Sequence, residues 1–94
     1  MIECKLERQV YAFDGSVIHR YHPNGTSHHF YIDFVASAEI VSDKKGRQHM
    51  QINMKENTDS SIAHWPKREL TPDTLPQAQA FVDAVMHAIA SREG

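Results

Sequence analysis

An apolar side chain stands at every second position over a long stretch in the middle of the chain. The alternating residues are Phe30, Ile32, Phe34, Ala36, Ala38 and Ile40. Strict alternation is the pattern of a β-strand with one buried face. A straight strand from His28 onward would be roughly 46 Å long, whereas a chain of 94 residues folds into a globule with a radius of gyration of roughly 12 Å. The strand must therefore bend, and the small residues 36–38 are the predicted corner, as in small barrels and orthogonal sandwiches.

The flanking segments have the same period. We predict strands over residues 2–12, 16–22, 28–35, 36–42, 47–55 and 62–65. In the first of these, apolar residues hold the even positions from Ile2 to Ala12, and only Arg8 interrupts them. Segments 2–12 and 16–22 are separated by Asp14-Gly15, which is a strong signal for a hairpin turn.

Glycine turns set the predicted register of the first three strands. With Gly15 in the left-handed region, Val10 lies opposite Ile18 and apolar residues stay together. Pairing of His22 with His28 then places Ile18 opposite Ile32.

A second glycine turn, Lys45-Gly46, follows the same rule. It sets Asp43 opposite Arg47, which predicts a cross-strand ion pair. The apolar pairs expected along this hairpin are Ile40–Met50, Ala38–Ile52 and Ala36–Met54.

Residues 75–91 are the predicted helix. Thr74 and Gln77 have the spacing of a capping box, with Thr74 as N-cap and Gln77 at N3. Six apolar residues recur at helical spacing and are predicted to face the sheet. They are Leu75, Ala78, Val82, Val85, Met86 and Ile89.

A stripe of small residues follows the same helix. Ala80, Ala84 and Ala88 recur every fourth position, and Phe81 lies beside them. A stripe of this kind allows a second helix to approach closely and predicts a self-complementary homodimer interface. The alternative is an exposed face built from the best helix former.

Charge and composition exclude several classes of protein. The chain has 10 basic and 12 acidic residues, a net charge of −2, which speaks against a partner bound by bulk charge such as nucleic acid. One cysteine cannot form an internal disulfide. No apolar run approaches the ~20 residues that span a bilayer, and the first residues lack the apolar core of a signal peptide. We therefore expect one domain over residues 1–94, a cytoplasmic location, no membrane insertion and no cofactor.

The predicted order of strands and helix resembles the pleckstrin-homology-like superfamily, and in particular its bacterial members. The resemblance covers about residues 1–92 and rests on that order, on the tract 30–40, on the Lys45-Gly46 turn and on the helical segment 80–85. It implies an α+β fold, in which a strongly bent antiparallel sheet or small barrel of about six to seven strands is closed by one C-terminal helix.

The function implied by this resemblance is a non-catalytic binding or self-assembly module, because members bind phosphoinositides, peptides or proteins. Members that bind phosphoinositides carry a basic loop between the first two strands. In this chain that loop is Phe13-Asp14-Gly15, which is short and acidic and offers no phosphate clamp. A protein partner or a second copy is therefore expected rather than a phosphoinositide.

A second resemblance leads to a different class of function. A curved sheet with one helix is also similar to Pur repeats and to single-stranded DNA-binding coactivators. These proteins bind single-stranded nucleic acid in basic grooves with stacking aromatics. Phe13, Tyr21 and Tyr31 could stack on bases, whereas the net charge speaks against nucleic acid.

One polar and aromatic stripe is the candidate ligand or partner surface. It lies on the sheet face opposite the predicted core, and aromatic side chains of this kind are enriched in interfaces. The alternative is a solvated outer face. The stripe consists of His19, Tyr21, His29, Tyr31 and Asp33.

Histidines also suggest metal chemistry. The chain has seven, and the pair predicted to meet across a hairpin is His22 with His28. Two ligands are fewer than the three or four that zinc takes, so no metal site is assigned. Cys4 is at one of the alternating positions predicted to be buried, and no residue nearby in the sequence is a candidate base for it. No catalytic triad stands out. A small histidine-dependent enzyme or metal protein is thus the third hypothesis, after the binding module and the nucleic-acid binder.

Overall fold

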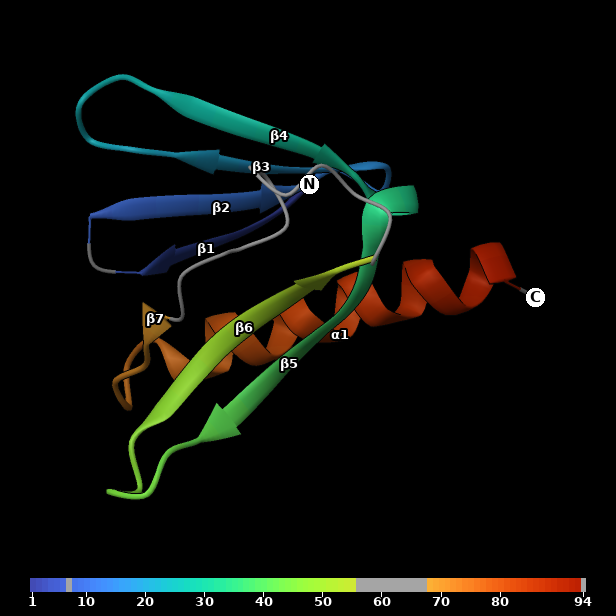
Figure 1. Cartoon of the computed structure of the whole chain (residues 1–94). Coiled ribbons are helices and arrows are strands. Elements are labelled where there is room, and N and C mark those ends of the chain that lie inside the picture. Colours follow the sequence, from blue (N-terminus) through green and yellow to red (C-terminus); the bar gives the residue numbers. More distant parts are fainter. Residues whose placement is uncertain (7, 56–67, 94) are drawn as a thin grey trace.

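Two antiparallel sheets follow one another along the chain, and one helix packs against both (Figure 1). The computed structural model describes residues 1–6, 8–55 and 68–93. The first sheet has the order β1 (Ile2–Leu6), β2 (Gln9–Phe13), β3 (Val17–Tyr21) and β4 (Ser27–Tyr31). The second contains β5 (Val35–Ser42), β6 (Gln48–Met54) and the two-residue strand β7 (Arg68–Glu69). The helix α1 spans Leu75–Glu93.

The α+β class and the antiparallel sheets are as predicted. The two sheets diverge from one another in Figure 1 and do not form a closed barrel. The predicted strand at 62–65 lies outside the described residues. No helix in the described part of the chain is long and apolar enough to cross a membrane.

The prediction of a single strand over residues 2–12 is wrong. The chain reverses between Leu6 and Gln9, so that Cys4 pairs with Tyr11. Arg8, the residue that interrupts the alternation, lies in this turn. The reversal changes which positions are buried. On β1 these are the even-numbered Cys4 and Leu6, and on β2 the odd-numbered Tyr11 and Phe13 are buried.

The register of β2 with β3 also differs from the prediction. Phe13, rather than Val10, lies opposite Ile18. The turn uses Gly15 at a φ of +102°, as predicted, and its two ends are tied by Asp14, which accepts hydrogen bonds from the backbone N–H groups of Ser16 and Val17. In the next hairpin Ile18 lies opposite Phe30, two residues from the predicted partner Ile32. A shift of two residues leaves each side chain on its predicted face.

The predicted bend is present, but it is made earlier than expected. The 3-10 helix η1 (Ile32–Phe34) separates β4 from β5, and its first N–H donates to the Ser16 carbonyl at 2.8 Å. A bulge between Val35 and Ser37 completes the corner. Beyond it the predicted pairs Ala38–Ile52 and Ile40–Met50 are confirmed, whereas Met54 lies opposite Val35 instead of Ala36 because of the bulge.

The turn between β5 and β6 is organised by one carboxylate. Asp43 accepts hydrogen bonds from the backbone N–H groups of Lys45 and Arg47 and from the Arg47 guanidinium at 2.9 Å, which confirms the predicted ion pair. The Arg47 backbone hydrogen bond, with smaller contributions from His49 and Lys45, holds the pKa of Asp43 well below its usual range. Gly46 has a φ of +81°, as predicted.

Replacing Gly46 with valine is expected to destabilise the protein by about 1–2 kcal/mol. A Cβ at Gly46 would meet no atom within 4 Å, so the cost comes from the left-handed backbone and not from a clash. Gly46→Asn is the matched control, because asparagine tolerates this region. Urea denaturation should rank wild type, Gly46→Asn and Gly46→Val in falling order. Equal stability of the two variants would contradict the assigned turn.

The helix contacts strands of both sheets. The burial of two helix residues, Phe81 and Met86, differs from the prediction. Ala78, Val82, Val85 and Ile89 are buried as predicted, Leu75 is partly buried, and Met86 is 39% exposed. Phe81 is fully buried and lies edge-on to Tyr11.

The first turn of the helix also differs from the predicted capping box. The backbone N–H of Lys5 donates to the side-chain oxygen of Gln77 at 3.3 Å. Thr74 instead bonds to Thr71, whose backbone N–H donates to the Thr74 hydroxyl at 2.8 Å. Gln77 therefore ties the helix to β1 rather than closing its own N-terminus.

Candidate functional site

The predicted stripe is brought together on the outer face of β3 and β4. His19 lies directly opposite His29, and Tyr31 lies opposite Val17. Tyr21 is 44% exposed and Tyr31 is 62% exposed. Asp33, the fifth predicted member, belongs to η1 and bonds to the helix instead.

Four polar side chains on this face form a continuous chain of contacts. His19 Nε2 lies 3.1 Å from Asp14 Oδ2, and the Nδ1 atoms of His19 and His29 are 2.6 Å apart. His29 Nε2 lies 2.9 Å from the Ser27 hydroxyl oxygen. The hydrogen bond from His19, followed by those from the backbone N–H groups of Ser16 and Val17, lowers the pKa of Asp14 from 3.8 to about 2.

For two neutral imidazoles, the direction of each hydrogen bond follows from the charge on Asp14. An ionised carboxylate only accepts, so His19 carries its hydrogen on Nε2 and a neutral His19 accepts at Nδ1. The hydrogen between the two rings therefore belongs to His29 Nδ1, and the bare Nε2 of His29 accepts from Ser27. The chain of donors runs one way, from Ser27 through His29 and His19 to Asp14.

Aromatic contacts support the two imidazoles. Tyr21 stacks on His19 with ring centroids 6.1 Å apart and lies edge-on to His29 at 5.9 Å. Tyr31 contacts Phe34 edge-on at 6.5 Å, and Phe34 is itself 48% exposed. The outer face thus ends in exposed aromatic rings at the corner where β4 passes into η1.

The other histidine pair lies on the opposite face of the same hairpin. His22 Nε2 is 3.2 Å from His28 Nδ1, which confirms that the two rings meet. Gln9 Nε2 lies 3.0 Å from His22 Nδ1, and Arg20 Nη2 lies 3.3 Å from His28 Nδ1. Within the described residues, no group of three or more histidine, cysteine, aspartate or glutamate side chains is placed to hold a metal ion.

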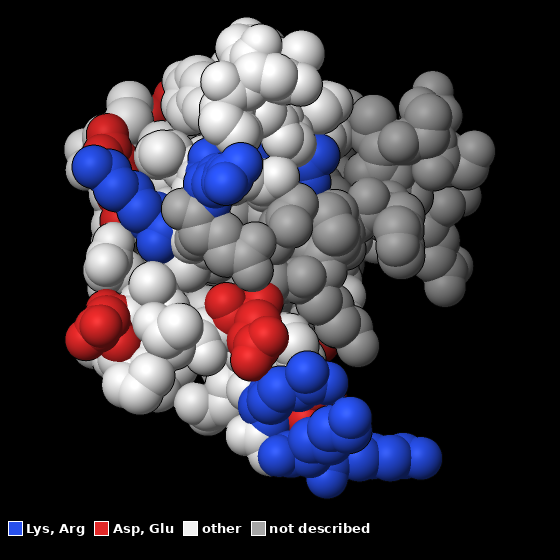
Figure 2. Space-filling view, turned by 90° about the vertical axis from the view of Figure 1, so that its left-hand side faces the viewer, with Lys and Arg blue, Asp and Glu red and all other residues white. Residues whose placement is uncertain are grey.

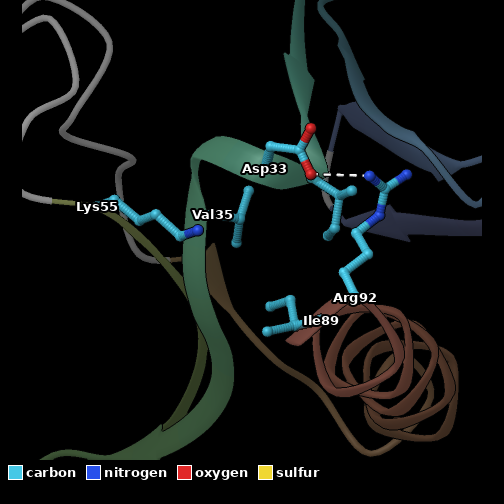
Figure 3. Close-up of a pocket in the computed structure, with 6 residues that line it drawn as sticks. Asp33, Val35, Lys55, Ile89 and Arg92 are labelled. Atoms are coloured by element: carbon cyan, nitrogen blue, oxygen red, sulfur yellow. Dashed lines mark hydrogen bonds and ion pairs between the residues drawn. The ribbon is translucent and has the colours of Figure 1, made fainter. Parts of the chain in front are cut away.

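Asp33 lines a small pocket at the end of the helix (Figure 3). Arg92 Nη1 donates to Asp33 at 2.7 Å, and Lys55 extends toward the same pocket from the end of β6. Ile32, Val35 and Ile89 supply its apolar lining, and the space amounts to about 20 Å³. A volume of that size holds a single water molecule rather than an organic ligand.

The alanine stripe does not form an open helix face. Phe81 is in the core, and Ala84 and Ala88 pack against it, so that Ala80 is the exposed member. Phe13, a predicted base-stacking residue, is only 4% exposed and is unavailable for stacking. Cys4 is fully buried, and burial raises the pKa of its thiol to about 11, which makes it a poor nucleophile.

Charge is distributed unevenly over the surface. Figure 2 shows basic side chains gathered at the lower end, where the turn between β5 and β6 carries the exposed residues Lys44, Lys45 and Arg47. The opposite end, formed by the hairpin of β3 and β4, is white in the same view because residues 21–31 contain no Lys, Arg, Asp or Glu.

The comparisons with known proteins return no relative. No family model matches the chain, and neither a curated protein nor a solved structure matches it. The function must therefore be argued from the site itself.

The sequence placed four of the five stripe residues on the face that they share in the structure, but it did not indicate two partners of the histidines. These partners are Asp14, which the sequence predicts only as a turn residue, and Ser27. Both belong to the site through hairpin geometry, since Ser27 lies two residues before His29 on the same face and Asp14 lies in the turn between β2 and β3. The signal for Ser27 was a hydroxyl two residues from His29 on the same strand, whereas Asp14 is five residues from His19 and is brought to it by the turn.

Proposed function

We propose that the chain is a non-catalytic self-assembly module, and that two copies associate through the edge strand β4 and the aromatic face beside it. The scaffold we infer is pleckstrin-homology-like. The order of the elements supports this inference, because four antiparallel strands are followed by three more and then by a C-terminal helix.

The observation that carries the proposal is the unprotected edge at β4. In the described part of the chain, β4 has a neighbouring strand on one side only, which is β3. Proteins usually protect such an edge with lysine, proline or a bulge. The strand Ser27-His28-His29-Phe30-Tyr31 contains no charged residue and no proline, and its pairing with β3 is regular.

The opposite edge of the same sheet shows the contrast. On β1, Glu3 and Lys5 are both exposed and charged. The backbone N–H of Lys5 is already bonded to Gln77 of the helix, and α1 packs along the strand. β1 is therefore protected against pairing with another strand, whereas none of the described strands covers the free edge of β4.

A second copy fits the β4 edge for a reason of symmetry. Two identical edge strands that pair antiparallel are related by a two-fold axis, so the surface is complementary to itself. The uncharged end of the molecule adds no repulsion between the copies. Tyr31 and Phe34 would lie close to the seam and lose their exposure on association.

Sedimentation equilibrium from about 1 µM to about 100 µM tests this proposal, a range that covers small, moderate-affinity interfaces. Wild type is expected to show a reversible dimer. Tyr31→Lys is expected to be a folded monomer, because it introduces a charge at the seam. Ala80→Lys, which adds the same charge on the exposed side of the helix, is expected to dimerise like wild type.

Two outcomes would contradict the proposal. A wild-type monomer at every concentration would exclude self-assembly. A dimer that survives Tyr31→Lys and is lost in Ala80→Lys would place the interface on the helix.

Single-stranded nucleic acid remains the second candidate, and the exposed rings of Tyr21 and Tyr31 on one face favour it. A mobility shift with a labelled oligonucleotide that weakens at higher salt would support this alternative.

A further inference from the structure

We propose that His19 and His29 form a binding site for a divalent transition-metal ion of the copper, nickel and zinc group. The inference goes beyond self-assembly and does not depend on it, since both histidines belong to one chain. Neutral imidazole nitrogen is a preferred ligand of these ions.

The first argument is that two ligand atoms converge. His19 and His29 are directly opposite each other on neighbouring strands, and their Nδ1 atoms are 2.6 Å apart. A metal bound at about 2.0–2.1 Å by each nitrogen, at an angle of about 90–110°, would need the nitrogens about 2.8–3.4 Å apart. A widening of under 1 Å, by rotation of the two rings, makes room for the metal ion, and the hydrogen on His29 Nδ1 moves to His29 Nε2, so that both rings bind the metal as neutral imidazoles.

The second argument is that the far side of each ring is already held. His19 Nε2 lies 3.1 Å from Asp14, and His29 Nε2 lies 2.9 Å from Ser27. Histidines that bind metals almost always hydrogen-bond their other ring nitrogen to a carboxylate or another polar group, which orients the ring. His19 has this arrangement with Asp14, and His29 gains it when its hydrogen moves to Nε2 and is donated to the Ser27 hydroxyl. The negative charge of Asp14 favours a cation nearby.

The third argument comes from comparison with the other pair. His22 and His28 also approach each other, at 3.2 Å, but Arg20 Nη2 lies 3.3 Å from His28 Nδ1. A guanidinium is always charged and repels a second cation at that position. Beside the outer pair lies a carboxylate instead, because Asp14 Oδ2 is 3.1 Å from His19 Nε2, on the side of the ring away from His29. The charge beside each pair therefore favours a metal ion at the outer pair over the inner pair.

Two protein ligands leave the remaining coordination positions to water. The site lies on an open face, where His29 is exposed and Tyr21 covers the pair from one side. We expect moderate affinity from two ligands, and a preference for Cu²⁺ over Ni²⁺ and Zn²⁺ as in most imidazole sites.

Isothermal titration with Cu²⁺ and with Zn²⁺ at pH 7.5 tests the site, on the Tyr31→Lys variant as well as on wild type. One metal ion per chain is expected for both. His19→Ala and His29→Ala should each weaken binding by about tenfold or more, and Asp14→Asn should weaken it by roughly tenfold. His28→Ala and His87→Ala, which remove histidines outside the site, should bind like wild type.

Electron paramagnetic resonance provides a second measurement, because hyperfine coupling counts the nitrogens on Cu²⁺. Two are expected in wild type and one in His29→Ala, with circular dichroism confirming that the variant is folded. Unchanged affinity in His29→Ala, or an equal loss in His28→Ala, would overturn the proposal. If Tyr31→Lys binds the metal while wild type is monomeric, self-assembly fails and the metal site stands.

Discussion

Replacing Leu6 with aspartate is expected to abolish cooperative folding at 25 °C. Leu6 is completely buried on β1, within the core that the first sheet shares with the helix. The substitution removes about 2–5 kcal/mol of packing and buries a carboxylate, which costs several kcal/mol more. A domain of this length has a total stability of only about 5–14 kcal/mol.

Lys5→Asp is the matched control for this variant. It introduces the same residue one position earlier, on an exposed side chain, and leaves the backbone hydrogen bond to Gln77 in place. Its stability is expected to lie within about 0.5 kcal/mol of wild type. Thermal unfolding followed by circular dichroism separates the two. A cooperative, wild-type-like transition in Leu6→Asp would mean that β1 turns its other face to the core.

Replacing Phe81 with alanine is expected to destabilise the protein by about 3–5 kcal/mol. Phe81 is fully buried, and its ring lies edge-on to Tyr11 with centroids 6.2 Å apart. The loss combines the transfer of an aromatic ring, the cavity left in the core and the contact with Tyr11. Urea denaturation measures it through a large fall in the midpoint at an unchanged slope.

A variant at the neighbouring residue Ala80 distinguishes a core role of Phe81 from a role on the surface. Ala80→Lys changes an exposed position beside Phe81 and should alter the midpoint very little. If Phe81→Ala proved as stable as wild type and changed only the association state, Phe81 would belong to an interface between copies.

The metal and assembly proposals concern neighbouring parts of one surface. His29 lies at the centre of β4, and Tyr31 lies at the end that passes into η1. Tyr31→Lys therefore tests the seam without touching either imidazole, and Asp14→Asn tests the histidine pair without touching β4. The two variants allow each proposal to fail alone.

Alternation predicted which residues share a face within one strand, but not where each strand ends, and for residues 2–12 the missed end also misassigned the buried face of β2. On residues 2–12, a hairpin and a strand interrupted once by Arg8 give almost the same pattern. The hairpin is favoured in the fold because it buries Tyr11 and Phe13 together with Cys4 and Leu6. The alternation within a strand depends only on neighbouring residues. The position at which the strand ends depends on which side chains can be buried together with those of the next strand.

The helix illustrates the same limit. A helix that faces one sheet buries a narrow stripe, and the sequence predicted such a stripe around Val82 and Val85. Because α1 contacts both sheets, a wider arc is covered, which takes Phe81 into the core and leaves Met86 partly exposed. How many sheets pack against a helix is decided by the tertiary structure. The spacing of apolar residues along the helix does not predict it.

By itself, the sequence determined the α+β class, the C-terminal helix, the left-handed glycines at positions 15 and 46, and the shared face of His19, Tyr21, His29 and Tyr31. These features depend on residues that are close together in the sequence. The shared face depends on the alternation of side chains along a strand, which a register shift of two residues leaves unchanged. Only the tertiary structure decided the reversal at Arg8, the position of the bend and the contacts of Asp14 and Ser27 with the histidines. These depend on the pairing of distant segments, because burial and hydrogen bonding are optimised over the whole chain.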